Sequence, residues 1–475
     1  MPVMAKRRAA AVALVASALG GCVAGPAPEI ATPAPVLPET YLYRPSGAVE
    51  TSLADLLPQG DAAFVRMAEV ALAGSPTLLE AVARIDAARA AADRAGANRL
   101  PAVGIGGSVT GSRTNPDQFG ANLPPGVEFD ITRVQYGANV TASWDPDVFG
   151  RLRSSERASL ALAEASAADR DAVRVALIAE LAAATIDWRT LSAREASLRR
   201  DLGTATEFAR LAGVREEAGL SPGFDRIRAE GTMANVQSRI DALAGEKARL
   251  LGRLVTLSTL DAGTIEALFA ETAPGTGAPP PPATLPSDLL SARPDVRAAF
   301  ARLAASDQAL AATAASRFPS FDLSAVVGLL AFGIGGLFDT DAIVGSLGAS
   351  VAAPLLDFGR IGAEIDGAAA DKRAAFQRYR GAVYQALGDA ESGYALVAAT
   401  DREAASARTE AALGARQADL ADTRYRAGLA DFLTVLDARR TAIAANERAD
   451  AAEGRASRAR VLLWQALGGS ESPLP

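Results

Sequence analysis

Few side chains in this 475-residue sequence can support acid–base, nucleophilic or metal chemistry. The sequence contains no histidine and one cysteine, which excludes imidazole bases, most metal sites and most thiol chemistry. Carboxylates, serines and lysines remain, but no phosphate-binding loop and no metal-ligand spacing appears. We therefore predict a protein that is not an enzyme, and we expect no cofactor and no metal apart from covalent lipid.

The one cysteine, Cys22, has a specific chemistry because it follows a secretory signal peptide. Residues 1–21 begin with three basic side chains, and residues 9–19 form an apolar core that is too short to span a bilayer. The sequence LGGC at residues 19–22 fits a bacterial lipobox, in which the cysteine thiol accepts diacylglycerol before cleavage. We predict diacylglycerol and palmitoyl on Cys22, since several acyl chains anchor a protein stably. An ordinary signal peptide with an accidental cysteine is the alternative.

The chain after Cys22 is acidic and begins with a linker. Residues 22–60 are rich in proline, which predicts an extended, lipidated tether. The net charge of −7 makes nucleic acid an unsuitable partner. No later stretch reaches the ~18 apolar residues of a membrane helix, so we expect any later membrane span to be a β-barrel.

Two matching sets of intervals reveal an internal duplication. Prolines are 25 positions apart at 76 and 101, and again at 294 and 319. Glycines are 69 positions apart at 150 and 219, and again at 359 and 428. Agreement of two independent intervals is improbable by chance, and repeats of this size indicate a duplicated architectural unit.

The duplication predicts the same series of elements in each half. The first repeat, 61–273, contains a helix, a strand pair within 102–145, a long helix 151–217, a tip and a helix 222–258. The second repeat, 287–469, contains a helix, a strand pair within 320–356, a long helix 360–425, a tip and a helix 431–467. A proline-rich linker, 274–286, joins the repeats in an equatorial region, and residues 470–475 form a tail.

The lengths of these elements suggest a membrane protein. Each strand is about ten residues long, which suits a tilted strand of a membrane barrel. Four strands cannot close a barrel, but three copies of the chain supply twelve, so we expect a trimer. Each long helix of about 65 residues spans about 100 Å. Soluble hairpins and a solid helical bundle are the alternatives to a barrel and a hollow helical tube.

The stretches that join the helices carry clear local signals. Gly219 and Gly428 lie where a helix end requires the left-handed conformation. Asp431 can cap the helix that follows Gly428. Leu433 and Asp437 lie one turn apart on that helix, so they share a face. On its own, such a pair is most simply a solvated helix surface.

Four motifs resemble the outer membrane factor family, the TolC-like efflux channels, and specifically their OprM/NodT-type lipoprotein branch. They are LPSDLLSARPDVRAAF at 285–300, LDFGR at 356–360, RYRAGLADFLTVLDARR at 424–440 and LLWQALGG at 462–469. The resemblance implies an α+β membrane protein with a trimeric twelve-stranded β-barrel, four strands per protomer, continuous with a long periplasmic α-helical barrel. It also implies the cell outer membrane as the location.

The resemblance further implies a function and partners. The expected function is passive conduction of small molecules in a tripartite efflux system. The expected partners are two further copies of the chain, a periplasmic membrane-fusion adaptor, an inner-membrane pump of the RND type and outer-membrane lipid. The outer-membrane duct of a type I protein-secretion system has the same fold and is the alternative, and a structural coiled-coil lipoprotein is a third possibility.

The resemblance also assigns roles to single residues. Leu433 and Asp437 occupy the places of the periplasmic gate, where rings of leucine and aspartate narrow the pore. Tyr425 and Asp225 match a latch between the two tips. The residues implied in adaptor docking are Gly219, Leu220, Gly428 and Leu429. Two positions depart from relatives, since Ala430 replaces an arginine and Thr434 replaces a second aspartate, and both changes alter the expected latch contacts.

Overall fold

The computed structural model describes residues 28–45, 52–113, 115, 132–219, 222–271 and 279–469. The predicted signal peptide, Cys22, Leu220 and the tail 470–475 lie outside the described residues. The chain divides into two compact units. The first unit comprises residues 1–33, 86–164 and 300–377, and the second comprises residues 34–85, 165–299 and 378–475.

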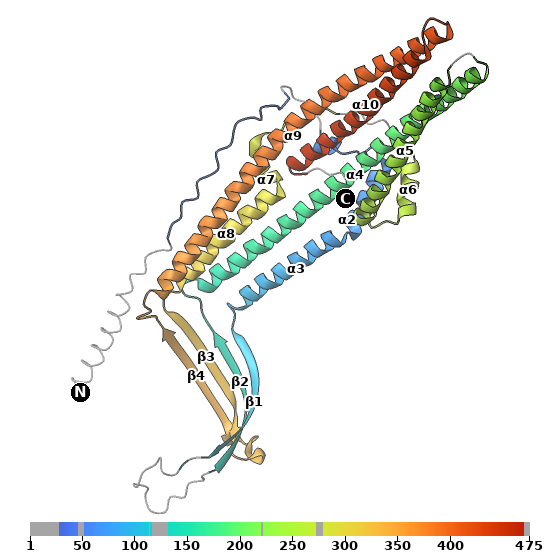
Figure 1. Cartoon of the computed structure of the whole chain (residues 1–475). Coiled ribbons are helices and arrows are strands. Elements are labelled where there is room, and N and C mark those ends of the chain that lie inside the picture. The colour runs from blue at the N-terminus through green and yellow to red at the C-terminus, as the bar shows by residue number, and fades with distance from the viewer. Residues whose placement is uncertain are drawn as a thin grey trace, which may run out of the picture. The chain divides into compact units, whose positions relative to one another are not determined.

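The first unit contains one antiparallel sheet built from both halves of the chain (Figure 1). Its strands are β1 (Ala102–Arg113), β2 (Thr132–Trp144), β3 (Ser320–Ala331) and β4 (Ile343–Ala352), in the order β1-β2-β3-β4. The two repeats meet where β2 pairs with β3, with Val140 opposite Val327. β1 and β4 are therefore the edges of the sheet, and each has one neighbour within the chain.

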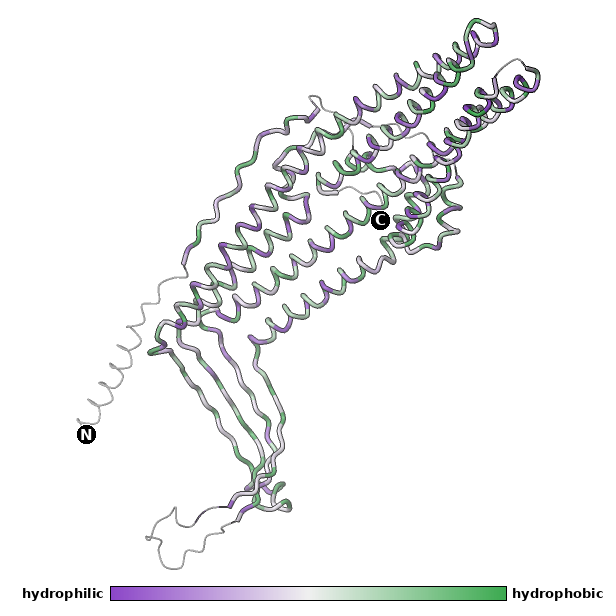
Figure 2. The backbone as a smooth tube through the Cα atoms, in the orientation of Figure 1, coloured by the Kyte–Doolittle hydropathy of each residue, from purple (hydrophilic) through white to green (hydrophobic). Residues whose placement is uncertain are grey.

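The two faces of this sheet differ in polarity because side chains alternate along a strand. Figure 2 shows hydrophobic positions along all four strands. Cross-strand partners share a face, and most of the large apolar side chains lie on one face. The side chains on that face are Val103, Ile105, Val109, Val134, Tyr136, Val140, Trp144, Phe321, Leu323, Val327, Leu329, Ile343, Leu347 and Val351. Ile105 is 89% exposed and Leu347 is 86% exposed, so this face is unprotected in the single chain. The opposite face carries mainly Ser, Thr, Asn and Gly, which suits contact with water.

The main helices have the expected order. α3 (Pro76–Ala97) and α8 (Pro294–Ala315) begin at the two repeat prolines, which are favoured at the first helical position. The long helices α4 (Arg151–Glu217) and α9 (Arg360–Arg426) each contain 67 residues. α5 (Gly223–Ser258) and α10 (Phe432–Ala466) follow the two tips. α9 ends one residue later than the sequence predicts, and α3 ends before its closing proline in a turn.

The second unit has the main apolar core and contains helices that were not predicted as separate elements. They are α2 (Ala62–Gly74), α6 (Ala262–Ala270) and the short α7 (Leu289–Ala292). The core gathers fully buried side chains from several helices, among them Phe64, Met67, Leu181, Tyr394 and Trp464. α6 begins after Thr259 adopts a left-handed conformation, φ 61°, and Asp261 caps it.

One stretch of the described residues, Ala62–Ala97, is long and apolar enough to cross a membrane by length and composition. The expectation that no such stretch follows the signal peptide is therefore wrong. The chain bends at Ser75 between α2 and α3, and Phe64 and Met67 are 0% exposed within the core of the second unit. Burial in this core accounts for the apolar character of α2.

Candidate functional site

The two long helices end in similar glycine turns. Gly219 has φ 69° and Gly428 has φ 72°, the left-handed conformation that glycine adopts without steric cost. After α9, the N–H of Gly428 donates to the carbonyl of Tyr425 and the N–H of Leu429 donates to that of Arg424. Asp431 accepts a hydrogen bond from the Thr434 N–H at 2.7 Å and caps α10, as predicted. Hydrogen bonds from the Thr434 hydroxyl and N–H lower the pKa of Asp431.

The two helical hairpins pack together near their tips. Phe208 of α4 lies 6.0 Å from Phe432 of α10, and Tyr425 lies 5.7 Å from Phe432, measured between ring centroids. Val435 and Leu436 are buried in the same cluster. An apolar cluster therefore joins the first hairpin to the second just behind the exposed turns.

The structure places Tyr425 against Arg215 of α4, whose guanidinium carbon lies 5.3 Å from the ring centroid. Among the described residues, no hydrogen bond joins the Tyr425 hydroxyl to Asp225. Asp225 lies in the first turn of α5. Tyr425 does connect the two hairpins, but through its ring, and the predicted hydrogen bond to Asp225 stays a prediction.

Leu433 and Asp437 share an exposed face of α10, on the opposite side from the buried Val435 and Leu436. Leu433 is 37% exposed. The Asp437 carboxylate has no partner among the described residues. The two side chains are thus free to meet their counterparts in other copies of the chain.

Asp437 also lines a groove of about 780 Å³ between α5 and α10. The charged side chains that line this groove are Asp437, Arg228, Arg239, Arg440 and Arg448. Four guanidinium groups and one carboxylate give the lining of the groove an excess of positive charge, which attracts anions. Sequence reasoning missed the two arginines of α5 because only the pairing of α5 with α10 brings them near Asp437.

A layer of charged side chains joins α4, α5 and α10 behind the tips. Glu447 of α10 is buried and forms ion pairs with Arg239 of α5 and Arg194 of α4. Asp450 of α10 accepts a hydrogen bond from Ser197 of α4 at 3.1 Å. Burial raises the pKa of Asp450 and that of Asp201. Because a buried charge is costly unless paired, this layer fixes how the three helices pack.

Two of the motifs quoted above contact each other in the second unit. Arg293 is buried and donates to the carbonyl of Ala466 at 3.0 Å. It also forms ion pairs with Asp295 at 2.6 Å and Asp389 at 3.0 Å. Burial opposes the charge of Arg293, but the two carboxylates outweigh it and raise the pKa of the guanidinium. These motifs are therefore structural.

In the described part of the structure, no group of three or more His, Cys, Asp or Glu side chains could hold a metal ion. The segment Gly219–Gly223 has the spacing Gly-x-Ser-x-Gly, but it joins two helices, whereas a nucleophile elbow joins a strand to a helix.

Comparison with protein families identifies both halves of the chain. The model of the family described as outer membrane efflux protein matches residues 67–260 and 285–469. The chain is 30% identical to the pyoverdine export outer membrane protein OpmQ of Pseudomonas aeruginosa, over 84% of this chain and 83% of OpmQ. It is 28% identical to the toluene efflux pump outer membrane protein TtgI of Pseudomonas putida, over 89% of this chain and 90% of TtgI.

Solved structures of similar fold cover almost the whole chain. The outer-membrane channel OprN aligns with a TM-score of 0.85 and 28% identity, over 95% of this chain and 100% of OprN. The open state of the Neisseria gonorrhoeae MtrE outer membrane channel aligns with a TM-score of 0.81 and 25% identity, over 93% of this chain and 97% of MtrE. These comparisons confirm that the four motifs belong to an outer membrane factor channel.

Proposed function

The chain belongs to the outer membrane efflux protein family, and from this membership we propose that it conducts small molecules passively, without enzymatic activity or a cofactor of its own. It is the outer-membrane channel of a tripartite efflux system. The observation that carries this function is the match of both halves to the family, together with the alignment to OprN over 95% of the chain. Its relatives above are efflux and export proteins, which favours efflux over type I protein secretion.

The channel is a homotrimer, and it works with a periplasmic adaptor and an inner-membrane pump. Each protomer supplies four strands, so three protomers supply the twelve-stranded barrel. The free edges β1 and β4 are the surfaces through which neighbouring protomers can pair. We propose that the pump is of the RND type, as the resemblance implies.

A deletion strain tests the function directly. Removal of the gene should increase sensitivity to a subset of dyes, antibiotics or metals, and restoring the gene should reverse this. The purified trimer should also conduct ions across a planar bilayer. Unchanged sensitivity together with a non-conducting trimer would contradict the efflux function, whereas retention of a secreted protein in the deletion strain would favour the secretion alternative.

We propose that Leu433 and Asp437 form the periplasmic gate. Three copies of Leu433 would make an apolar constriction, and three copies of Asp437 would make a polar ring one turn further along α10. The exposure of both side chains on one helix face supports this role.

The gate proposal predicts a conductance change. Leu433→Ala and Asp437→Ala should each raise the single-channel conductance in a planar bilayer, because each removes a ring that narrows the pore. Leu413→Ala, on an exposed face of α9, is a matched control and should leave conductance unchanged. Wild-type conductance in both gate variants would refute the assignment.

We propose that the exposed turns at the tips contact the adaptor. Apart from chain neighbours, no described residue lies within 4 Å of a Cβ placed on Gly219 or Gly428, so these turns are open to an approaching partner. Leu429 is 70% exposed beside Gly428. Leu220, the fourth proposed docking residue, lies outside the described residues and follows Gly219 in the sequence as Leu429 follows Gly428.

We propose that Cys22 carries the diacylglycerol and palmitoyl groups. The support from the described residues is Ile30, which packs against a cluster in the first unit formed by α8 and α9. Ile30 lies eight positions after Cys22, which allows a reach of about 28 Å. Mass spectrometry of the mature protein tests this, since Cys22→Ser should lose the mass of the acyl chains, and an equal mass in both proteins apart from one sulfur-to-oxygen change would disprove lipidation.

A further inference from the structure

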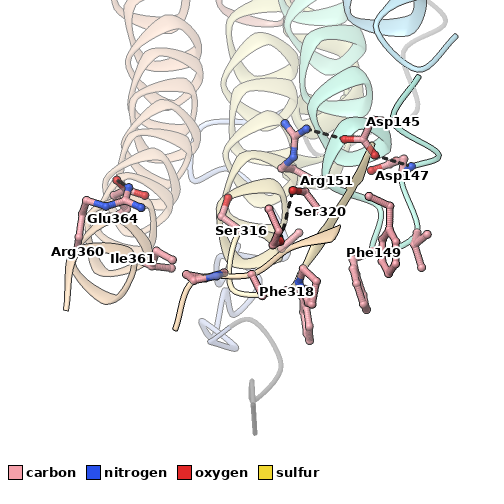
Figure 3. Close-up of a pocket in the computed structure, with 17 residues that line it drawn as sticks. Asp145, Asp147, Phe149, Arg151, Ser316, Phe318, Ser320, Arg360, Ile361 and Glu364 are labelled. Carbon is pink, nitrogen blue, oxygen red and sulfur yellow. Dashed lines mark hydrogen bonds and ion pairs between the residues drawn. The ribbon is translucent and has the colours of Figure 1, made fainter. Parts of the chain in front are cut away.

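A pocket of about 590 Å³ lies where the sheet of the first unit meets its helices (Figure 3). It is lined by the turn from β2 to α4, the turn from α8 to β3, the end of β4 and the start of α9. Side chains from both repeats therefore form it. Neither the gate nor the tips contribute to this pocket.

Three phenylalanine rings form one wall of the pocket. The Phe149 ring stacks on Phe318 at a centroid distance of 4.6 Å, and it lies 6.3 Å from Phe321. Phe321 pairs with Val351 and belongs to the apolar face of the sheet. The stack thus continues the apolar face of the sheet into the turns next to the helices.

Charged groups of both signs form the rest of the wall. Arg151 forms an ion pair with Asp145 at 3.0 Å, and Arg360 forms one with Glu364 at 2.7 Å. The Asp147 carboxylate accepts hydrogen bonds from two amides of the first turn of α4 and is therefore occupied. Three carboxylates against two guanidinium groups leave the pocket with a formal charge of −1. The net negative charge of the pocket disfavours a purely anionic ligand, but it allows a zwitterionic ligand, which carries one positive and one negative group.

The sheet locates this pocket relative to the membrane. Trp144 lies on the apolar face at the helix end of β2, and Tyr136 lies on the same face eight residues away. Eight residues span about 27 Å along a strand, close to the ~25 Å apolar band of a membrane barrel flanked by aromatic girdles. The pocket adjoins the Trp144 end, so it lies at the level of the lipid headgroups on the helix side of the membrane.

We propose that this pocket binds the headgroup of a phospholipid of the ethanolamine type. The phosphate would lie against the guanidinium groups of Arg151 and Arg360, and the ammonium would donate to the carboxylates of Asp145 and Glu364. The phenylalanine stack contacts the apolar part of the lipid next to the headgroup. An ethanolamine headgroup fits better than choline because its ammonium has three N–H donors and choline has none. The site depends on the outer-membrane location alone and is independent of the gate and the pump.

Native mass spectrometry of the full-length trimer tests the site. Delipidated trimer in detergent is titrated with phosphatidylethanolamine, phosphatidylcholine and phosphatidylglycerol that carry the same acyl chains. Phosphatidylethanolamine should bind up to three copies per trimer and at least tenfold more tightly than the other two lipids. Arg360→Gln and Glu364→Gln should each abolish this tenfold preference.

A matched control and a competitor complete the experiment. Arg408→Gln is the matched control, and it breaks an ion pair with Glu453. The side chains of this pair are 58% and 47% exposed, comparable with 65% and 47% for Arg360 and Glu364. This variant should keep the preference for phosphatidylethanolamine. Equal binding of the three lipids would overturn the proposal and indicate boundary lipid only. Displacement of the lipid by inorganic phosphate would also overturn it, since the site would then be a simple anion site. If a variant fails to assemble, the three-lipid comparison on the wild type still decides between these outcomes.

Discussion

Replacing Gly428 with leucine separates a docking role of the tip from a purely structural one. Gly428 has φ 72° at the turn between α9 and α10, and apart from its chain neighbours no described residue lies within 4 Å of a Cβ at that position. A side chain there would therefore project away from the protomer. Gly359 provides the control, because it has φ 89° and equally open surroundings at the opposite end of α9.

The open surroundings of the two glycines determine the expected loss of folding free energy in each variant. With no clash inside the protomer, each leucine should cost only the left-handed strain of a non-glycine residue, about 1–2 kcal/mol. This cost is the same at Gly428 and Gly359, and the trimer should assemble with both variants. If an adaptor helix approaches the tip closely, Gly428→Leu should also weaken adaptor binding by at least about tenfold, equivalent to about 1.4 kcal/mol.

The assay compares the two variants in a deletion strain. Trimer abundance in outer-membrane fractions, adaptor co-purification and dye accumulation are measured for each. Gly428→Leu should restore trimer but not efflux, whereas Gly359→Leu should restore both. Wild-type efflux in Gly428→Leu, or an equal loss of efflux in Gly359→Leu, would refute the reasoning.

Three further predictions concern the packing of the hairpins. Tyr425→Phe removes the hydroxyl but keeps the ring beside Arg215. If the hydroxyl forms a latch hydrogen bond, the single-channel conductance should rise in this variant. The contact of the ring with Arg215, which the variant keeps, stabilises the packing by about 0.5–1 kcal/mol. Arg189→Leu should lower the unfolding free energy by about 3–5 kcal/mol in urea, because it leaves the buried Asp61 without its bidentate partner at 2.8 and 3.0 Å. Asp201→Asn should raise the unfolding temperature at pH 7 and have no effect near pH 3, because burial raises the pKa of Asp201 in the folded state.

The sign of the last effect follows from proton binding. As the pH rises above the ordinary aspartate value, the unfolded chain loses the Asp201 proton while the folded chain keeps it, so stability falls with pH. A neutral asparagine avoids this loss. A wild-type unfolding temperature for Asp201→Asn at pH 7 would contradict the argument, and so would a loss of under 1 kcal/mol for Arg189→Leu. Raised conductance in Arg215→Gln but not in Tyr425→Phe would assign the latch to the ring contact.

Elements with local signals could be predicted from the sequence. The bounds of α4 follow from the glycine turns at Gly150 and Gly219, both of which have positive φ. The Asp431 cap follows from its place after Gly428. Such signals act within a few residues, so a single sequence suffices to find them.

Features that depend on pairing of distant helices could not be predicted. The groove arginines Arg228 and Arg239 reach Asp437 only because α5 packs beside α10. Glu447 resembles a surface residue of an alanine-rich helix, yet it is buried between two arginines. The contact of Arg215 with the Tyr425 ring was also not predicted, because no sequence rule fixes which side chain of α4 lies over that ring.

The two edge strands of the sheet, β1 and β4, determine how the channel assembles in the membrane. β1 has 12 residues and β4 has 10, and in each strand every second residue directs its backbone N–H and C=O away from the sheet, where no described strand pairs with them. Each backbone group without a hydrogen bond is costly in hydrocarbon. A monomer or a dimer is therefore not a stable intermediate in the bilayer. Insertion and trimerisation must therefore occur together. A subunit in which one edge strand cannot pair should inactivate every trimer that contains it. Such an allele should therefore be dominant over the wild type.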